Sequence, residues 1–149
     1  TRQVPWLGAV IVIYFLFWTF LAHMIFAVFM GLAVMTSVST SLDVFLTSRG
    51  LSMIAVELGV GAILSFLLFS LTVVSIPLVL EKEIDFVSAM LLSLRTVASN
   101  LSIMLAWAAI IAVSSLIALA PYFLGLMIVL PIFGHATWHL YRRALYDPI

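Results

Sequence analysis

Long apolar runs separated by short polar stretches make up most of the chain. Residues 6–35, 101–120 and 122–141 contain no Asp, Glu, Lys or Arg, and residues 51–80 contain only Glu57. About 20 apolar residues in a helix are enough to cross the hydrocarbon core of a bilayer, which is about 30 Å thick. The pattern therefore predicts an all-α integral membrane protein, a helical bundle with four transmembrane helices.

Prolines mark the places where these apolar runs must bend or turn. A single helix over residues 101–141 would be about 60 Å long, twice the thickness of the hydrocarbon core. We therefore expect a turn at residues 120–125, next to Pro121, and a tight hairpin of the third and fourth spans. Pro77 interrupts the second span near its end, and Pro131 is expected to kink the fourth.

The stretch between the second and third spans has the pattern of an amphipathic helix. A charged segment, residues 81–85, leads into residues 85–100, where apolar side chains recur at helical spacing. The apolar positions are Phe86, Met90, Leu94 and Val97, and the opposite face carries Asp85, Ser88, Arg95 and Ser99. We expect this helix to lie in the membrane interface. The alternative is an inward extension of the third span.

The connection between the first and second spans is rich in Ser and Thr. Residues 40–43, Thr-Ser-Leu-Asp, have the form of a helix capping box. They predict a short surface helix over residues 41–47, which Gly50 ends before the second apolar run.

Two rows of small residues follow the second span at helical spacing. One row consists of Ser52, Ala55, Gly59 and Ala62, and the other includes Gly61 and Ser65. Inside lipid no hydrophobic force draws helices together, so close backbone approach at small residues and hydroxyl hydrogen bonds hold a bundle together. The second span is therefore predicted to pack against helices on two sides.

The composition agrees with a membrane protein and excludes several other classes. Of 149 residues, 66% are hydrophobic and 8% are charged, which leaves too little polar surface for a water-soluble globule. The net charge of zero offers no basic face for nucleic acid. The absence of cysteine excludes disulfides and metal centres that cysteine would ligate.

The basic residues predict the orientation of the chain in the membrane. With four spans, Arg2, Lys82, Arg95, Arg142 and Arg143 fall on the side of the termini, and Arg49 falls on the other side. Because cytoplasmic loops carry the excess of Lys and Arg, both termini are expected on the cytoplasmic side of a bacterial inner membrane. Trp138, Tyr141, Arg142 and Arg143 are expected to anchor the last helix there.

Glu57 is the only acidic residue inside a predicted span. A charge at that depth is costly, so an ionisable group within a membrane helix is a candidate functional residue. Counted at 1.5 Å per residue, Glu57 and His23 both fall towards the outer leaflet, where they could form a proton-relaying or register-setting pair. The alternative is that Glu57 reaches the outer headgroups while His23 binds a backbone carbonyl.

His135 and His139 are four residues apart and project from one face of the last span. Such a pair is a weak candidate metal site, because a third ligand at the same depth is available only from Glu81, Glu83 or Asp85. The two rings cannot hold one haem from opposite sides, since both lie on one helix. The competing interpretation places both histidines in an interfacial aromatic belt.

Two tryptophans, Trp18 and Trp107, lie deep in predicted spans. An indole N–H at that depth needs a hydrogen-bond acceptor, which another subunit, a pigment or a lipid carbonyl could provide. We expect no cofactor within the chain itself, only contact with haem or pigment at an interface with a partner. The sequence contains no catalytic triad and no glycine-rich phosphate loop, so an enzyme is not expected.

Three segments carry a resemblance to a known family: residues 20–26 (Phe-Leu-Ala-His-Met-Ile-Phe), residues 73–87 around Pro77, and residues 130–143, which are the most specific. They resemble a family of predicted bacterial integral membrane proteins known as a domain of unknown function. Members of that family look longer, so the chain is expected to be the C-terminal portion of a longer protein. The resemblance implies no activity and no catalytic residues.

Two functions from different classes are the main hypotheses, and a haem- or metal-handling protein that uses His135 or His139 is a third. The first is an accessory or assembly subunit of a larger inner-membrane complex for energy conversion, respiratory or photosynthetic, that acts by lateral helix packing. It is favoured by the small extramembrane part and the small-residue rows. The alternative is a small transporter or channel that uses Glu57 and His23.

Overall fold

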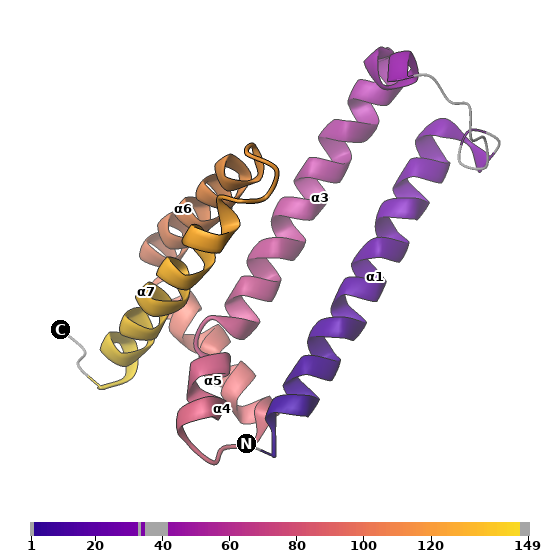
Figure 1. Ribbon diagram of the computed structural model, residues 1–149. Helices are drawn as coiled ribbons and strands as arrows, with labels where there is room; N and C mark the ends of the chain where they lie inside the picture. Colours follow the sequence, from indigo (N-terminus) through magenta and orange to yellow (C-terminus); the bar gives the residue numbers. More distant parts are fainter. Residues whose placement is uncertain (1, 33, 35–41, 147–149) are drawn as a thin grey trace. The chain divides into compact units, whose positions relative to one another are not determined.

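The computed structural model describes residues 2–32, 34 and 42–146 of the chain (Figure 1). In that part of the chain every regular element is helical and no strand occurs, as predicted. The elements are α1 (Val4–Met30), η1 (Leu42–Leu46), α3 (Ser48–Thr72), α4 (Ser75–Glu81), α5 (Phe86–Ser99), α6 (Leu101–Leu119) and α7 (Leu126–Tyr146).

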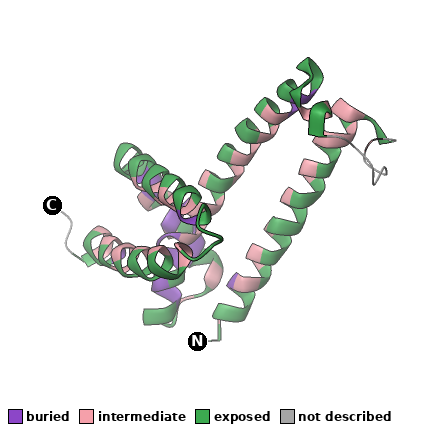
Figure 2. Ribbon diagram, turned by 45° about the horizontal axis from the view of Figure 1, so that its top comes forward, coloured by how far each residue is buried: buried purple, intermediate pink, exposed green. Residues whose placement is uncertain are grey.

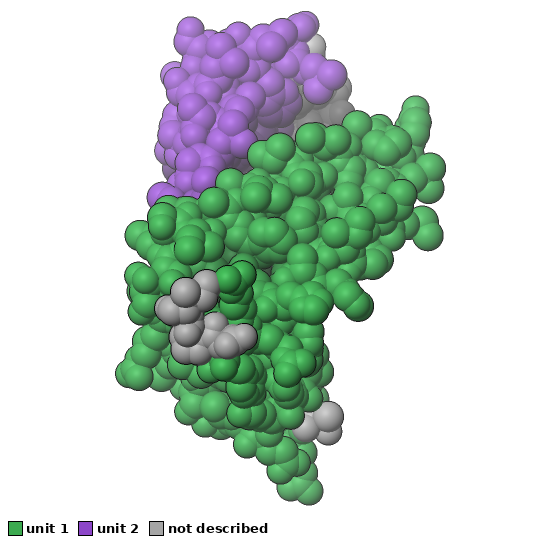
Figure 3. Space-filling model, turned by 90° about the vertical axis from the view of Figure 1, so that its left-hand side faces the viewer, with its two compact units in different colours: residues 1–7, 68–149 green, residues 8–67 purple. Residues whose placement is uncertain are grey.

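The chain divides into two compact units (Figure 3). The first unit consists of residues 8–67 (unit 2 in Figure 3), and the second unit consists of residues 1–7 and 68–149 (unit 1 in Figure 3). Most of the buried residues belong to the second unit (Figure 2). The two units are therefore described one after the other.

In the first unit, α1 and α3 run side by side in opposite directions (Figure 1). The hydroxyl of Tyr14 donates a 2.6 Å hydrogen bond to the carbonyl oxygen of Leu64. The ring of Trp18 lies 3.6 Å from the point where a side chain on Gly61 would begin. Helix α1 ends at Met30, and Gly31 follows it with a φ of +82°, a left-handed conformation that favours glycine after a helix.

The connection between the first and second predicted spans, which leads into α3, differs from its prediction. The predicted surface helix is a 3₁₀ helix, η1, whereas residues 40 and 41 of the predicted capping box lie outside the described residues. Gly50 does not end that helix but lies in the first turn of α3. The Thr47 hydroxyl caps this turn by accepting from the Gly50 N–H at 3.1 Å. A side chain at position 50 would come within 2.7 Å of the Phe45 backbone, so close packing requires the glycine.

In the second unit, α4, α5, α6 and α7 pack on one another around a small core. The side chains of Val74, Leu78, Ala89, Met90 and Val97 are buried in it. Helix α5 agrees with the predicted residues 85–100, and Met90 and Val97 of its predicted apolar face are buried. Asp85 caps its start, since its carboxylate accepts from the Ser88 N–H at 2.9 Å.

The turn between α6 and α7 lies where the sequence predicted it. Tyr122 and Phe123 have φ values of 50° and 66°, a left-handed conformation that reverses the chain within a few residues. Gly125 lies against the start of this turn, because a Cβ there would come 2.7 Å from the carbonyl oxygen of Ala118. Helix α7 continues through Pro131 without ending there.

Three of the described helices are long and apolar enough to cross a membrane. They cover Val4–Met30, Ser48–Glu81 and Leu101–Leu119, so the predicted first, second and third spans are each represented. Helix α7 is not among them, because the polar residues of its second half, which include Arg142 and Arg143, lower its mean hydropathy. The fourth span and the interfacial position of α5 stay predictions.

Candidate functional site

The boundary between α3 and α4 is the first candidate site, because the backbone hydrogen bonding of an apolar helix is interrupted there. The helix breaks at residues 73–74, between Thr72 and Ser75. Proline at position 77 has no N–H for the carbonyl of Val73, and its ring would collide with that carbonyl in a straight helix. Pro77 therefore explains why the break lies four residues before it.

The hydroxyl of Ser93, on α5, fills this break. It accepts from the Val74 N–H at 3.1 Å and donates to the carbonyl oxygen of Ser70 at 2.7 Å. In an uninterrupted helix this N–H and this carbonyl would bond directly to each other. Ser93 is completely buried, so its hydroxyl replaces the missing helical bond away from water.

Sequence reasoning did not identify Ser93. Its position three residues after Met90 and four before Val97 places it on the buried face of α5. A serine on the apolar face of an amphipathic helix, near a proline-interrupted span, was the available signal. A buried hydroxyl must find a hydrogen-bond partner, and an interrupted helix provides one.

A second polar contact joins the ends of α4 and α7. The side chain of Tyr141 is buried, and its hydroxyl donates a short hydrogen bond to the Glu81 carboxylate. The ring of Tyr146 packs edge-on against Tyr141, and the Lys82 ammonium lies 4.7 Å from the centre of the Tyr146 ring. A hydrogen bond with Tyr146 raises the pKa of Lys82 above its usual value. The structure makes Tyr141 a contact between two helices, and its role as a membrane anchor stays a prediction.

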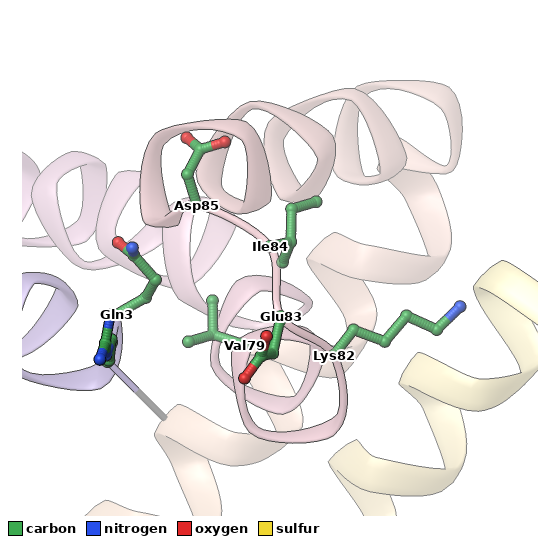
Figure 4. A pocket seen from close by; sticks show the side chains of 7 residues that line it. Gln3, Val79, Lys82, Glu83, Ile84 and Asp85 are labelled. Atoms are coloured by element: carbon green, nitrogen blue, oxygen red, sulfur yellow. The ribbon is translucent and has the colours of Figure 1, made fainter.

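A polar pocket of about 370 Å³ lies beside this contact, lined by Arg2, Gln3, Val79, Lys82, Glu83, Ile84 and Asp85. Its charged side chains do not converge on a common point (Figure 4). Lys82 extends towards α7, and Asp85 turns to the start of α5, where the hydrogen bonds from Ser88 lower its pKa. The pocket therefore offers no set of groups arranged around one ligand.

Glu57 and His23 lie on α3 and α1, the two long helices of the first unit. Glu57 is half-buried and His23 is exposed. The His23 ring nitrogen Nδ1 lies 2.7 Å from the carbonyl oxygen of Thr19 on its own helix. This contact is the backbone interaction named above as the alternative for His23, and the pair with Glu57 stays a prediction.

His135 and His139 lie on one face of α7, as their spacing predicts. Their ring centres are 6.4 Å apart, and both side chains are exposed. Within the described part of the chain, no group of three or more His, Cys, Asp or Glu side chains is placed to hold a metal ion. The described residues thus supply no third ligand next to this pair.

The two small-residue rows of α3 have different surroundings. Gly61, of one row, faces the ring of Trp18 within the chain. The other row, Ser52, Ala55, Gly59 and Ala62, is exposed, and no atom lies within 4 Å of the point where a side chain on Gly59 would begin. The hydroxyls of Ser52 and Ser65 bond to carbonyl oxygens of their own helix, at 2.8 Å and 2.6 Å. Gly61 therefore packs inside the unit, whereas Ser65 of the same row and all four residues of the other row are exposed.

The deep tryptophans also differ. Trp18 packs in the first unit, where its ring stacks with that of Phe15. Trp107, on α6, meets the ring of Phe133 on α7 edge-on at 5.6 Å. Its indole Nε1 is buried and has no hydrogen-bond partner among the described residues. The Trp107 indole N–H thus still needs a hydrogen-bond acceptor, as its predicted depth in the span implies.

Comparison with known proteins identifies the family of the chain. A family model described as "Predicted integral membrane protein (DUF2189)" matches residues 1–81. The match includes residues 20–26 and the start of the segment around Pro77, and residues 130–143 lie outside it. No curated protein and no solved structure matches the chain. Because the match covers more than half of the 149 residues, the chain belongs to this family of integral membrane proteins.

Proposed function

We propose that the chain is an accessory or assembly subunit of a larger bacterial inner-membrane complex, respiratory or photosynthetic, and that it acts by lateral helix packing. One observation carries the proposal: the row Ser52, Ala55, Gly59 and Ala62 of α3 is exposed, and nothing lies close to Gly59. In lipid, rows of small residues are the surfaces on which helices approach closely.

The chain itself shows how such a row is used. The other row of α3 includes Gly61, and the absence of a side chain there leaves room for the Trp18 ring of α1. The open row also consists of small residues on the same helix, but no helix of the described residues packs against it. A helix from another subunit would pack on it in the way α1 packs on Gly61.

The proposal includes a topology with four spans, in which α7 crosses the membrane as the fourth. Its first half, from Leu126, is apolar, and its polar end then reaches the interface at Trp138. Helix α5 lies along the interface with Arg95 exposed, and both termini are cytoplasmic.

Native electrophoresis after gentle detergent extraction tests the assembly. We expect the wild-type chain to co-migrate with a larger complex, and Gly59→Leu to lose this co-migration because a large side chain keeps the second helix away. Gly8→Leu is the matched control, since Gly8 also has nothing within 4 Å of its Cβ position. Migration of the wild-type chain only as a free monomer would refute the proposal.

The alternative function is a small transporter or channel in which Glu57 and His23 line the pathway. The observation that favours it is the position of Glu57, half-buried in the first half of an apolar helix that is long enough to cross the membrane. Proton or solute flux into liposomes containing the purified chain tests this function. A flux that Glu57→Gln abolishes would support transport, and the absence of flux in the wild-type chain would exclude it for that solute.

A further inference from the structure

The second unit contains an apolar cleft of about 380 Å³ between α3–α4 and the hairpin of α6 and α7. Pro77 and Leu80 line it on one side, and Phe133, Gly134 and Trp138 of α7 line it on the other. Its volume lies within the range of about 300–1,000 Å³ that is typical of small-ligand sites. A continuous apolar wall of this kind suits a hydrocarbon chain.

Positive charge lies at one end of this cleft. Gly134, Trp138 and Arg142 follow one another at intervals of four residues, so Arg142 continues the cleft-lining face of α7 by one turn. Arg142 and Arg143 are both exposed, and the helix from Leu126 to Tyr146 has no acidic residue. Glu81 and Lys82, which follow the lining residue Leu80, are engaged with Tyr141 and Tyr146. The cleft is thus mainly apolar along its length, and Arg142 and Arg143 supply exposed positive charge at one end.

We propose that this cleft binds an anionic glycerophospholipid, with one acyl chain against Gly134 and Phe133 and the phosphate beside Arg142. Basic groups between membrane helices are known to select anionic headgroups. The complementarity has two parts: the cleft wall fits the acyl chain, and the arginine side chain compensates the charge of the headgroup.

The dimensions argue against a helix of another protein as the occupant. A helix with side chains is about 10 Å in diameter, so about one turn of it would fill the volume of the cleft. One turn gives a short contact compared with the several turns along which membrane helices pack. An acyl chain is narrower and flexible, and can follow the whole cleft.

The test measures lipid retention by the purified full chain in neutral detergent, using native mass spectrometry. The probes are phosphatidylglycerol and phosphatidylcholine with the same acyl chains. We expect the wild-type chain to retain more phosphatidylglycerol. Arg142→Gln should lower retention of this lipid about fivefold, the usual contribution of one basic residue near an anionic headgroup, and leave phosphatidylcholine unchanged.

Filling the cleft gives the second variant. Gly134 has nothing within 4 Å of its Cβ position, so Gly134→Leu adds its side chain to the cleft without a backbone clash. We expect it to lose both lipids. The matched controls are Gly8→Leu, which adds the same side chain outside the cleft, and Arg95→Gln, which removes an exposed charge on α5; both should retain lipid as the wild-type chain does.

Three results would overturn the proposal. The first is that the wild-type chain retains the two lipids equally, and the second is that Gly134→Leu retains as much phosphatidylglycerol as the wild-type chain. The third is that the wild-type chain forms a dimer that Gly134→Leu dissociates, which would assign the cleft to a second copy of the chain. If Gly134→Leu does not fold, Arg142→Gln still tests the proposal, since this substitution leaves the cleft lining intact. In that case an unchanged preference for phosphatidylglycerol would refute the assigned headgroup position.

Discussion

Replacement of Ser93 by alanine is the most direct test of how the interrupted second span is stabilised. The substitution removes one oxygen atom from a completely buried position and leaves the rest of α5 unchanged. It breaks two hydrogen bonds together, the 3.1 Å bond from the Val74 N–H and the 2.7 Å bond to the Ser70 carbonyl. A donor and an acceptor of the backbone are then left without this bridge.

The expected loss of stability follows from these two bonds. Side-chain hydrogen bonds in membrane proteins contribute about 0.6 kcal/mol each on average, which sets a lower value of about 1 kcal/mol for the pair. A buried backbone group left without a partner costs about 1–3 kcal/mol. We therefore expect Ser93→Ala to lower the free energy of unfolding by about 1–3 kcal/mol.

A double-mutant cycle with Pro77 separates this bridge from general packing. In Pro77→Ala the backbone N–H at position 77 returns, and the helix can continue straight so that the Val74 N–H bonds directly to Ser70. Ser93→Ala should then cost less than about 0.5 kcal/mol in the Pro77→Ala background. The coupling between the two positions is expected to be about 1 kcal/mol.

Reversible unfolding in mixed micelles, followed by circular dichroism, measures these free energies. Ser99→Ala is the matched control, because Ser99 lies on the same helix and is exposed. Its expected effect is within about 0.5 kcal/mol of zero. A loss for Ser93→Ala no larger than that of the control, or strict additivity with Pro77→Ala, would show that the bridge does not stabilise the break.

Further changes test the other contacts. Tyr141→Phe removes the hydrogen bond to Glu81 and should lower the free energy of unfolding by about 1–3 kcal/mol, measured in the same unfolding assay; an unchanged value would contradict the contact. Gly125→Ala should lower it by about 1–3 kcal/mol through overpacking at the α6–α7 turn, and full wild-type stability would show that the turn can open freely. Hydrogen bonds from Ser88 lower the pKa of Asp85, so its capping contribution is present above the unfolded pKa of about 3.9 and is lost as the pH falls through the lower folded value. Thermal melts from pH 7 to pH 2 should show this loss in the wild-type chain and a smaller one in Asp85→Asn, and identical pH profiles would refute the assignment.

Helices and turns were predictable because each follows from local chemistry. The uncharged runs at residues 6–35 and 101–120 correspond to α1 and α6, and the turn at residues 120–125 follows from the length limit of a membrane helix. Helix α5 follows from its amphipathic pattern and its Asp85 cap. In each case the information lies within a few turns of the element itself.

The contacts between helices were not predictable in the same way. The Ser93 bridge joins residues 23 positions apart, and the bond from Tyr141 to Glu81 joins residues 60 positions apart. A serine or tyrosine in an apolar helix has many permitted partners, including carbonyls of its own helix, as Ser52 and Ser65 show. Only the packing of the helices decides which partner is used.

The way the break in the second span is filled bears on function. In many transporters, helices interrupted within the membrane leave backbone groups free to bind substrate or ions. Here the hydroxyl of Ser93 bonds to both the Val74 N–H and the Ser70 carbonyl, so these two groups are already occupied within the chain. The kink is thereby a packed feature that holds α5 against α4, whereas the small residues around Gly59 are exposed on the surface of α3. This distribution favours a protein whose surface, more than its interior, is the site of interaction.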